Sequence, residues 1–110
     1  MELNYLNASG KSAVTGNPPL KEILNAIQAF EQNLKEHQEI ALKLGGFGQS
    51  LTMFAEEIQC INDNMILFKG VSPHGEACTL IQHISQVNFI LAAVPKSRDA
   101  ETARRIKFMI

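Results

Sequence analysis

The N-terminal half of the chain carries apolar residues at helical spacing. Between Leu20 and Ala41 they recur every three or four positions, with charged and amide residues between them, and this spacing puts them on one face of an α-helix. Residues 17–19, Asn-Pro-Pro, suit the first turn of a helix, and the glycines at 45–46 suit its end. The pattern predicts one long amphipathic helix over residues 18–44.

Further along the chain, the apolar period shortens to two. Alternation of apolar and polar residues between positions 51 and 81 is typical of β-strands with one buried face. Turn-forming residues interrupt it at 62–64 and 72–75. The pattern predicts a strand meander over residues 50–110, while residues 1–16 predict only a short strand and a loop.

The expected fold is α+β, with the long helix packed on a small, mainly antiparallel sheet. The chain has 110 residues, of which 45% are hydrophobic, and this suits a single domain over residues 1–110 with a modest core. Chains with limited burial of their own commonly associate. We therefore expect a homo-oligomer, either a dimer or an assembly of dimers.

Residues 80–94 read LIQHISQVNFILAAV and mix polar side chains into the most apolar stretch of the chain. We expect a strand with a bend near Ser85 and Gln86. Buried amides and imidazoles cost free energy unless they find hydrogen-bond partners. These polar residues therefore need either partners inside the protein or a ligand; they are Gln82, His83, Ser85, Gln86 and Asn88.

The net charge of −1 argues against a protein that binds DNA, RNA or a membrane surface. All three arginines nevertheless lie beyond residue 95. Arg104 and Arg105 are adjacent, and a guanidinium group binds phosphate through two parallel hydrogen bonds. The amide of Asn88 can read a base edge or a ribose hydroxyl, and Phe89 offers a stacking face. These residue types describe a site for a small phosphorylated nucleotide.

The histidines and cysteines show no pattern of a metal centre or a catalytic site. His37, His74 and His83 share no ligand spacing with Cys60 or Cys78. A nucleophile pair of Cys78 with His83 has no third residue to orient it. We therefore expect no metal, no cofactor and no catalytic residue, and we expect both cysteines to be buried thiols. The sequence shows no secretory signal and no apolar run of membrane-spanning length, which predicts a cytoplasmic protein.

The helix that begins at residues 17–19, the segment 80–94 and the RRIKF strand near residue 110 together resemble the Thoeris anti-defence sponges of phages. That family captures cyclic ADP-ribose signals made by bacterial TIR enzymes. The resemblance implies a small α+β protein of the host cytoplasm that binds glycocyclic ADP-ribose without cleaving it. It also implies a homo-oligomer with pockets between subunits, and some family members bind cyclic oligonucleotides as well.

The resemblance maps the asparagine and the arginine of the family's pocket onto Asn88 and Arg105. Two other interpretations remain open. The helix could be the docking face of a protein–protein interaction module, or His83 and Cys78 could serve a small hydrolase or lyase. Further candidate ligand-binding residues are Phe89, Arg104, His83, Gln82 and Gln86.

Overall fold

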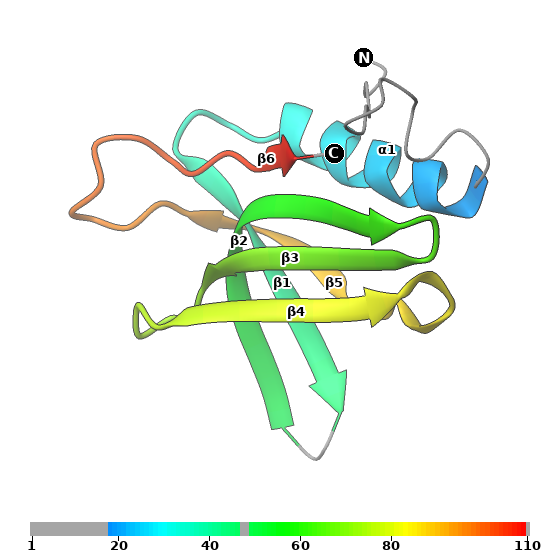
Figure 1. The fold of residues 1–110 in the computed structure, drawn as a ribbon. Coiled ribbons are helices and arrows are strands. Elements are labelled where there is room, and N and C mark those ends of the chain that lie inside the picture. Colours follow the sequence, from blue (N-terminus) through cyan, green and yellow to red (C-terminus); the bar gives the residue numbers. More distant parts are fainter. Residues whose placement is uncertain (1–17, 47–48, 110) are drawn as a thin grey trace.

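The computed structural model describes residues 18–46 and 49–109 (Figure 1). The elements in chain order are α1 (Pro18–Gln32), β1 (Gln38–Gly46), β2 (Gln49–Asn62), β3 (Met65–Val71), β4 (Ala77–His83), the 3-10 turn η1 (Ile84–Gln86), β5 (Ile90–Pro95) and β6 (Lys107–Met109). The helix packs on a six-stranded sheet in the order β4-β3-β2-β1-β5, and β6 pairs in parallel with β2. All other pairings are antiparallel, which confirms the α+β class expected from the sequence.

The long strand β2 bends and joins two parts of the sheet that cross at a steep angle (Figure 1). Its first half pairs with β1 up to Phe54, and its second half pairs with β3. Glu56 is an extra residue between the paired Ala55 and Glu57, and such a bulge bends the strand. Gly70 lies opposite, where a Cβ would come within 2.0 Å of the carbonyl oxygen of Phe54. The bend therefore depends on a glycine at this position.

Helix α1 covers one face of the sheet. Its apolar side buries Leu20, Leu24 and Ile27 in one cluster with Phe68 of β3. Fully burying a side chain of this kind stabilises the fold by about 1.5–3 kcal/mol. Figure 1 shows β6 beside the helix, and Ile106, just before β6, belongs to the same cluster. The core thus joins the helix, the central strands and the segment that leads into β6.

The predicted helix over residues 18–44 is wrong in its second part. Helix α1 ends at Gln32, and Gln38–Gly46 forms β1 between β2 and β5. Residues 40–42 are all buried, because both faces of this central strand are covered. A strand buried on both faces lacks the alternation that would distinguish it from a buried helix segment. The glycines at 45–46 consequently end a strand, not a helix.

The meander predicted over residues 50–110 holds for β2, β3 and β4 only. The turns at 62–64 and 72–75 lie where the sequence predicts them and connect these three strands. The bend predicted near Ser85 is a full break, because η1 separates β4 from β5. Strand β5 then pairs with β1, and β6 pairs with β2. The strand and loop predicted over residues 1–16 lie outside the described residues.

Candidate functional site

Four of the predicted site residues line one cleft, which we name the amide cleft. It lies between the outer end of the β1–β2 pair, strand β4 and the loop after η1, and its volume is about 560 Å³. Its apolar walls are Leu44, Leu51, Leu80 and Ile81, and its polar lining is Gln82, His83, Gln86 and Asn88. Four of the five polar residues of the apolar segment at 80–94 therefore gather around a shared space, and Ser85 does not line it.

The turn η1 brings these polar residues together. The backbone N–H of Ser85 donates to Nδ1 of His83 at 3.2 Å, and the Ser85 hydroxyl oxygen lies 2.8 Å from the same nitrogen. Nδ1 is thus an acceptor, so the proton of the neutral ring sits on Nε2. The chain reverses at this capped turn, which places Gln86 and Asn88 at the same cleft as Gln82.

Gln82 holds an unpaired polar atom at the amide cleft. Its side-chain oxygen Oε1 is buried and has no hydrogen-bond partner among the described residues. A buried acceptor that is left unpaired costs about 1–3 kcal/mol. Because Oε1 has almost no exposed surface, a ligand in the cleft could pair with it only if the Gln82 side chain turned outward.

Phe89 follows the amide cleft but packs into the core. Its ring meets the ring of Phe68 edge to face, with the ring centres 5.2 Å apart. Phe89 is half-buried against the core cluster and is not among the residues that line the cleft. Its ring anchors the loop that carries Asn88, in place of the stacking role that the sequence suggested.

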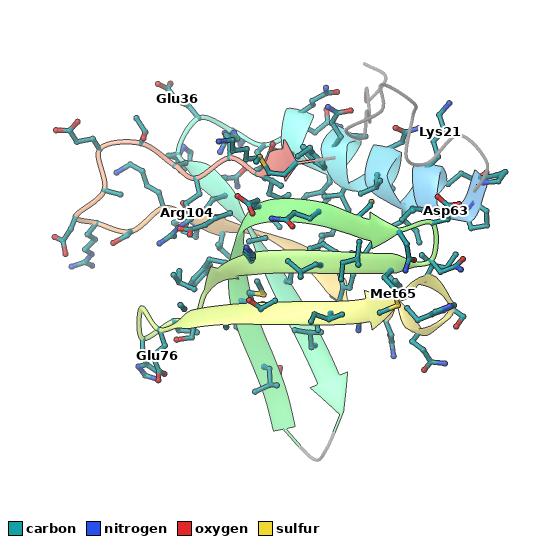
Figure 2. The ribbon with its side chains drawn as sticks, in the orientation of Figure 1. Lys21, Glu36, Asp63, Met65, Glu76 and Arg104 are labelled. Carbon is teal, nitrogen blue, oxygen red and sulfur yellow. The ribbon has the colours of Figure 1, made fainter. Side chains whose placement is uncertain are left out.

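Arg104, which is labelled in Figure 2, is held by two carboxylates. Its guanidinium pairs with Glu39, which is 2% exposed, and its Nε donates to Glu56 at 2.9 Å. The same group lies over the ring of Phe54, 5.4 Å from its centre. Burial lowers the pKa of Arg104, but its hydrogen bonds and charge interactions with Glu56 and Glu39 outweigh burial and leave the pKa raised. Arg104 therefore has a structural role, as the cation that pairs with Glu39 and Glu56.

Arg105 lines a second cleft of about 360 Å³, which we name the arginine cleft. Its guanidinium donates to the backbone oxygens of Gln38 at 2.7 Å, Arg104 at 2.8 Å and Lys35 at 3.2 Å. These bonds use three of the five guanidinium N–H groups, and the other two have no partner among the described residues. The lining is mixed in charge and includes Lys96, Glu36 and Glu101.

The two clefts lie at opposite ends of β5. Asn88 precedes the start of this strand, whereas Arg105 binds the carbonyl of Gln38, which lies beside its end. The six residues of β5 span roughly 20 Å at about 3.3 Å per residue. Figure 2 shows Arg104 at one side of the sheet and Met65, beside the end of β4, at the other. One chain therefore does not bring Asn88 and Arg105 together.

The other chemistry considered from the sequence is not assembled in the described residues. Cys78 and His83 lie five positions apart on β4, so their side chains point to opposite faces and do not form a nucleophile pair. No group of three His, Cys, Asp or Glu side chains in the described part of the chain could hold a metal ion. Within the same residues, no helix is both long and apolar enough to cross a bilayer. Cys60 and Cys78 are free thiols, each half-buried.

Residues 13–109 match a family model described as a family of unknown function, DUF6173. The chain belongs to this family. The DUF6173 match covers every helix and strand of the described structure, and therefore both clefts. No curated protein and no solved structure matches the chain.

The sequence pattern gives no role to three acids that the structure of this DUF6173 protein places around the arginines. Glu31, Glu39 and Glu56 each accept a hydrogen bond from the segment at 104–106. An isolated acid inside an apolar run is a signal of a buried ion pair, since charged residues are rarely buried without a partner. Glu39 does not fit this description, because it follows the polar residues 35–38, and nothing in the sequence distinguishes Glu31 from the exposed Glu22 of the same helix.

Proposed function

We propose that the protein binds and sequesters a cyclic ADP-ribose signal, such as glycocyclic ADP-ribose, without cleaving it. A captured signal would no longer activate Thoeris-type bacterial immunity. The observation that carries the proposal is the amide cleft, where four candidate ligand-binding residues meet and one of them has a buried acceptor without a partner among the described residues.

The amide cleft suits a purine nucleotide in size and chemistry. Its volume of about 560 Å³ falls within the range of small-molecule sites, which is about 300–1,000 Å³. The leucine and isoleucine walls can cover the faces of a base. If its side chain turns outward, Gln82 can accept from an exocyclic amino group through Oε1, which is buried in the free protein. The Asn88 amide can both donate and accept at a base edge or a ribose hydroxyl.

The pyrophosphate of such a ligand needs cations, which the amide cleft lacks. Arg105 has two N–H groups that no described residue occupies, but they lie near the far end of β5. A second copy of the chain would supply them if its arginine cleft faced the amide cleft of the first. We therefore propose a homo-oligomer with pockets between subunits. DNA, RNA and membrane surfaces fit less well, because Glu36 and Glu101 beside Arg105 repel an extended polyanion.

Calorimetric titration of cyclic ADP-ribose isomers tests the proposal. Arg105→Ala should lose at least about 2 kcal/mol of binding free energy, because a charge-assisted bond to phosphate disappears. Asn88→Ala should lose about 1 kcal/mol, the value of a neutral hydrogen bond. Arg98→Ala and Gln32→Ala are matched controls, since both side chains are exposed, and they should leave the affinity unchanged.

Three outcomes would contradict parts of this proposal. Absence of heat with every cyclic nucleotide would reject the sponge and favour the interaction module. Recovery of a cleaved product after heating the complex would favour the hydrolase or lyase instead. A sedimentation coefficient of a monomer at micromolar concentration, with ligand bound, would reject the pocket between subunits.

A further inference from the structure

Arg105 lies between two backbone N–H groups that carboxylates hold. The N–H of Arg104 donates to Oε2 of Glu39 at 2.8 Å, and the N–H of Ile106 donates to Oε2 of Glu31 at 2.6 Å. A hydrogen bond to an ionised acceptor is about twice as strong as one between neutral groups. The peptide is therefore fixed on both sides of Arg105.

The two carboxylates come from firmly packed elements. Glu31 lies in the last turn of α1, one turn after the buried Ile27. Glu39 lies on β1, which pairs on both edges, and is itself almost fully buried. Residues 103–106 have no helix or strand of their own. Rigid elements position a functional group better than loops do. The two acids therefore fix this segment relative to α1 and β1.

The side chain of Arg105 returns to the same two elements. Its guanidinium donates to the carbonyls of Lys35 and Gln38, in the connection between α1 and β1. Two bonds of 3.0 Å close that connection, one from Gln38 N–H to Lys35 O and one from Lys35 N–H to Gln38 Oε1. Both the backbone and the guanidinium of Arg105 are thus fixed relative to one junction. The two unoccupied N–H groups of the guanidinium accordingly have a defined direction.

We propose that Glu31 is a positioning residue for phosphate recognition, because by holding the Ile106 amide it fixes the Arg105 guanidinium in the arginine cleft. The inference rests on the proposed function, in which Arg105 contacts a phosphate of the ligand. Glu31 itself does not line the arginine cleft, so it acts through Arg105. Glu39 holds the other side of Arg105, but it also pairs with the guanidinium of Arg104, which makes Glu31 the cleaner residue to test.

Two substitutions of Glu31 separate the hydrogen bond from the charge. Glu31→Gln keeps an oxygen that can accept from Ile106, so its affinity for cyclic ADP-ribose should stay within about threefold of the wild type. Glu31→Met removes the acceptor at similar size and helix propensity. The affinity should fall about tenfold or more, by analogy with the loss seen when a hydrogen bond that orients a metal ligand is removed. Glu22→Met is the matched control on an exposed glutamate of the same helix, and it should leave the affinity unchanged.

A double substitution tests whether Glu31 acts through Arg105. In the Arg105→Ala background, Glu31→Met should change the affinity by less than about twofold, because the group that Glu31 positions is gone. A purely structural role predicts that the two losses add. Additive losses, or equal affinities for Glu31→Met and Glu31→Gln, would overturn the proposal. All variants are compared at a temperature at which circular dichroism shows them folded.

A measurement on the ligand-free protein separates this inference from the proposed function. In heteronuclear NMR spectra, the guanidinium N–H signals of Arg105 should be resolved in the wild type, because its bonds to carbonyl groups hinder rotation of the guanidinium. They should persist in Glu31→Gln and Glu22→Met and broaden in Glu31→Met. If this pattern is found but no cyclic ADP-ribose binds, the proposed function fails and the positioning of Arg105 stands. Unchanged signals in Glu31→Met would overturn the positioning itself.

Discussion

The segment that carries the two arginines and the amide cleft differ in how their polar groups are paired. Around the arginines, Glu31, Glu39 and Glu56 each bind an N–H group of the segment. In the amide cleft, Oε1 of Gln82 is buried without a partner among the described residues. Pairing makes the first region a rigid frame. The unpaired acceptor makes the second region less stable in the free protein, as is expected where a residue serves binding and not folding.

The largest effect should come from breaking the frame. Arg104→Ala leaves the carboxylate of Glu39 buried without its cation, and the free energy of unfolding should fall by about 3 kcal/mol. This is the lower end for a buried pair, because Arg104 is partly exposed and water can enter in its place. Arg98 is an exposed arginine of the same region, and Arg98→Ala should change the free energy of unfolding by less than about 0.5 kcal/mol. If urea unfolding gave the same loss of free energy of unfolding for both variants, Arg104 would not have the structural role described here.

In the amide cleft, we expect a substitution to raise the free energy of unfolding. Gln82→Met replaces the unpaired amide by an apolar group of similar size, so the free energy of unfolding should rise by about 1 kcal/mol while ligand binding is lost. Gln59→Met is the matched control on β2, because the Gln59 amide donates to Glu57 at 2.6 Å, and it should be neutral or destabilising. If Gln82→Met were destabilising, the contrast between the two regions would not hold.

A smaller effect should appear in the dependence of stability on pH. Burial raises the pKa of Glu31 above 4.5, although the hydrogen bond from Ile106 and the charge of Arg105 oppose the shift. The folded protein therefore keeps this proton at a pH where the unfolded chain has released it. The stabilisation is fully present below about pH 4.5 and is lost as the pH rises through the folded-state pKa. Urea unfolding at several pH values measures the free energy of unfolding as a function of pH. The decrease with rising pH that is due to Glu31 should be present in Glu22→Gln and absent in Glu31→Gln.

The last prediction concerns the reactivity of the two thiols, and we expect no change in the stability of the fold. Burial, with a contribution from Asp63, raises the pKa of Cys60 to about 11. Since the thiolate is the reactive form, Cys60 should be alkylated at pH 8 about 100-fold more slowly than a free thiol. Cys78 lines a small cleft beside Leu80 and should react faster. Mass spectrometry after timed treatment with iodoacetamide measures both rates, and faster labelling of Cys60 would contradict this order.

Local chemistry was sufficient to predict the parts of the fold that depend on neighbouring residues. The start of α1 and the turns at 62–64 and 72–75 follow from residues that favour those backbone conformations. The strand at Gln38–Gly46 could not be predicted, because its burial comes from β2 and β5, which lie far along the chain. The bulge at Glu56, which bends β2, is likewise a product of pairing with β3.

The site divides in the same way. The polar residues of the amide cleft could be identified because polar side chains in an apolar segment are themselves a signal, and the turn at Ser85 gathers them locally. The two arginines, in contrast, look alike in the sequence. Their separate roles depend on Glu39, which lies 65 residues away from Arg104 and is visible as its partner only once the chain is folded.

That separation of 65 residues also sets an order of events during synthesis. A ribosome that adds about 5–20 residues per second makes Glu39 roughly 3 to 13 seconds before Arg104. During this interval the carboxylate is without its cation, so β1 gains little from burying it and keeps it hydrated. We therefore expect the hairpins of the nascent sheet to form first, and the region around Glu39 to pack fully only after Arg104 is available to pair with it. On this expectation, completion of the core waits for translation of the segment that carries both arginines.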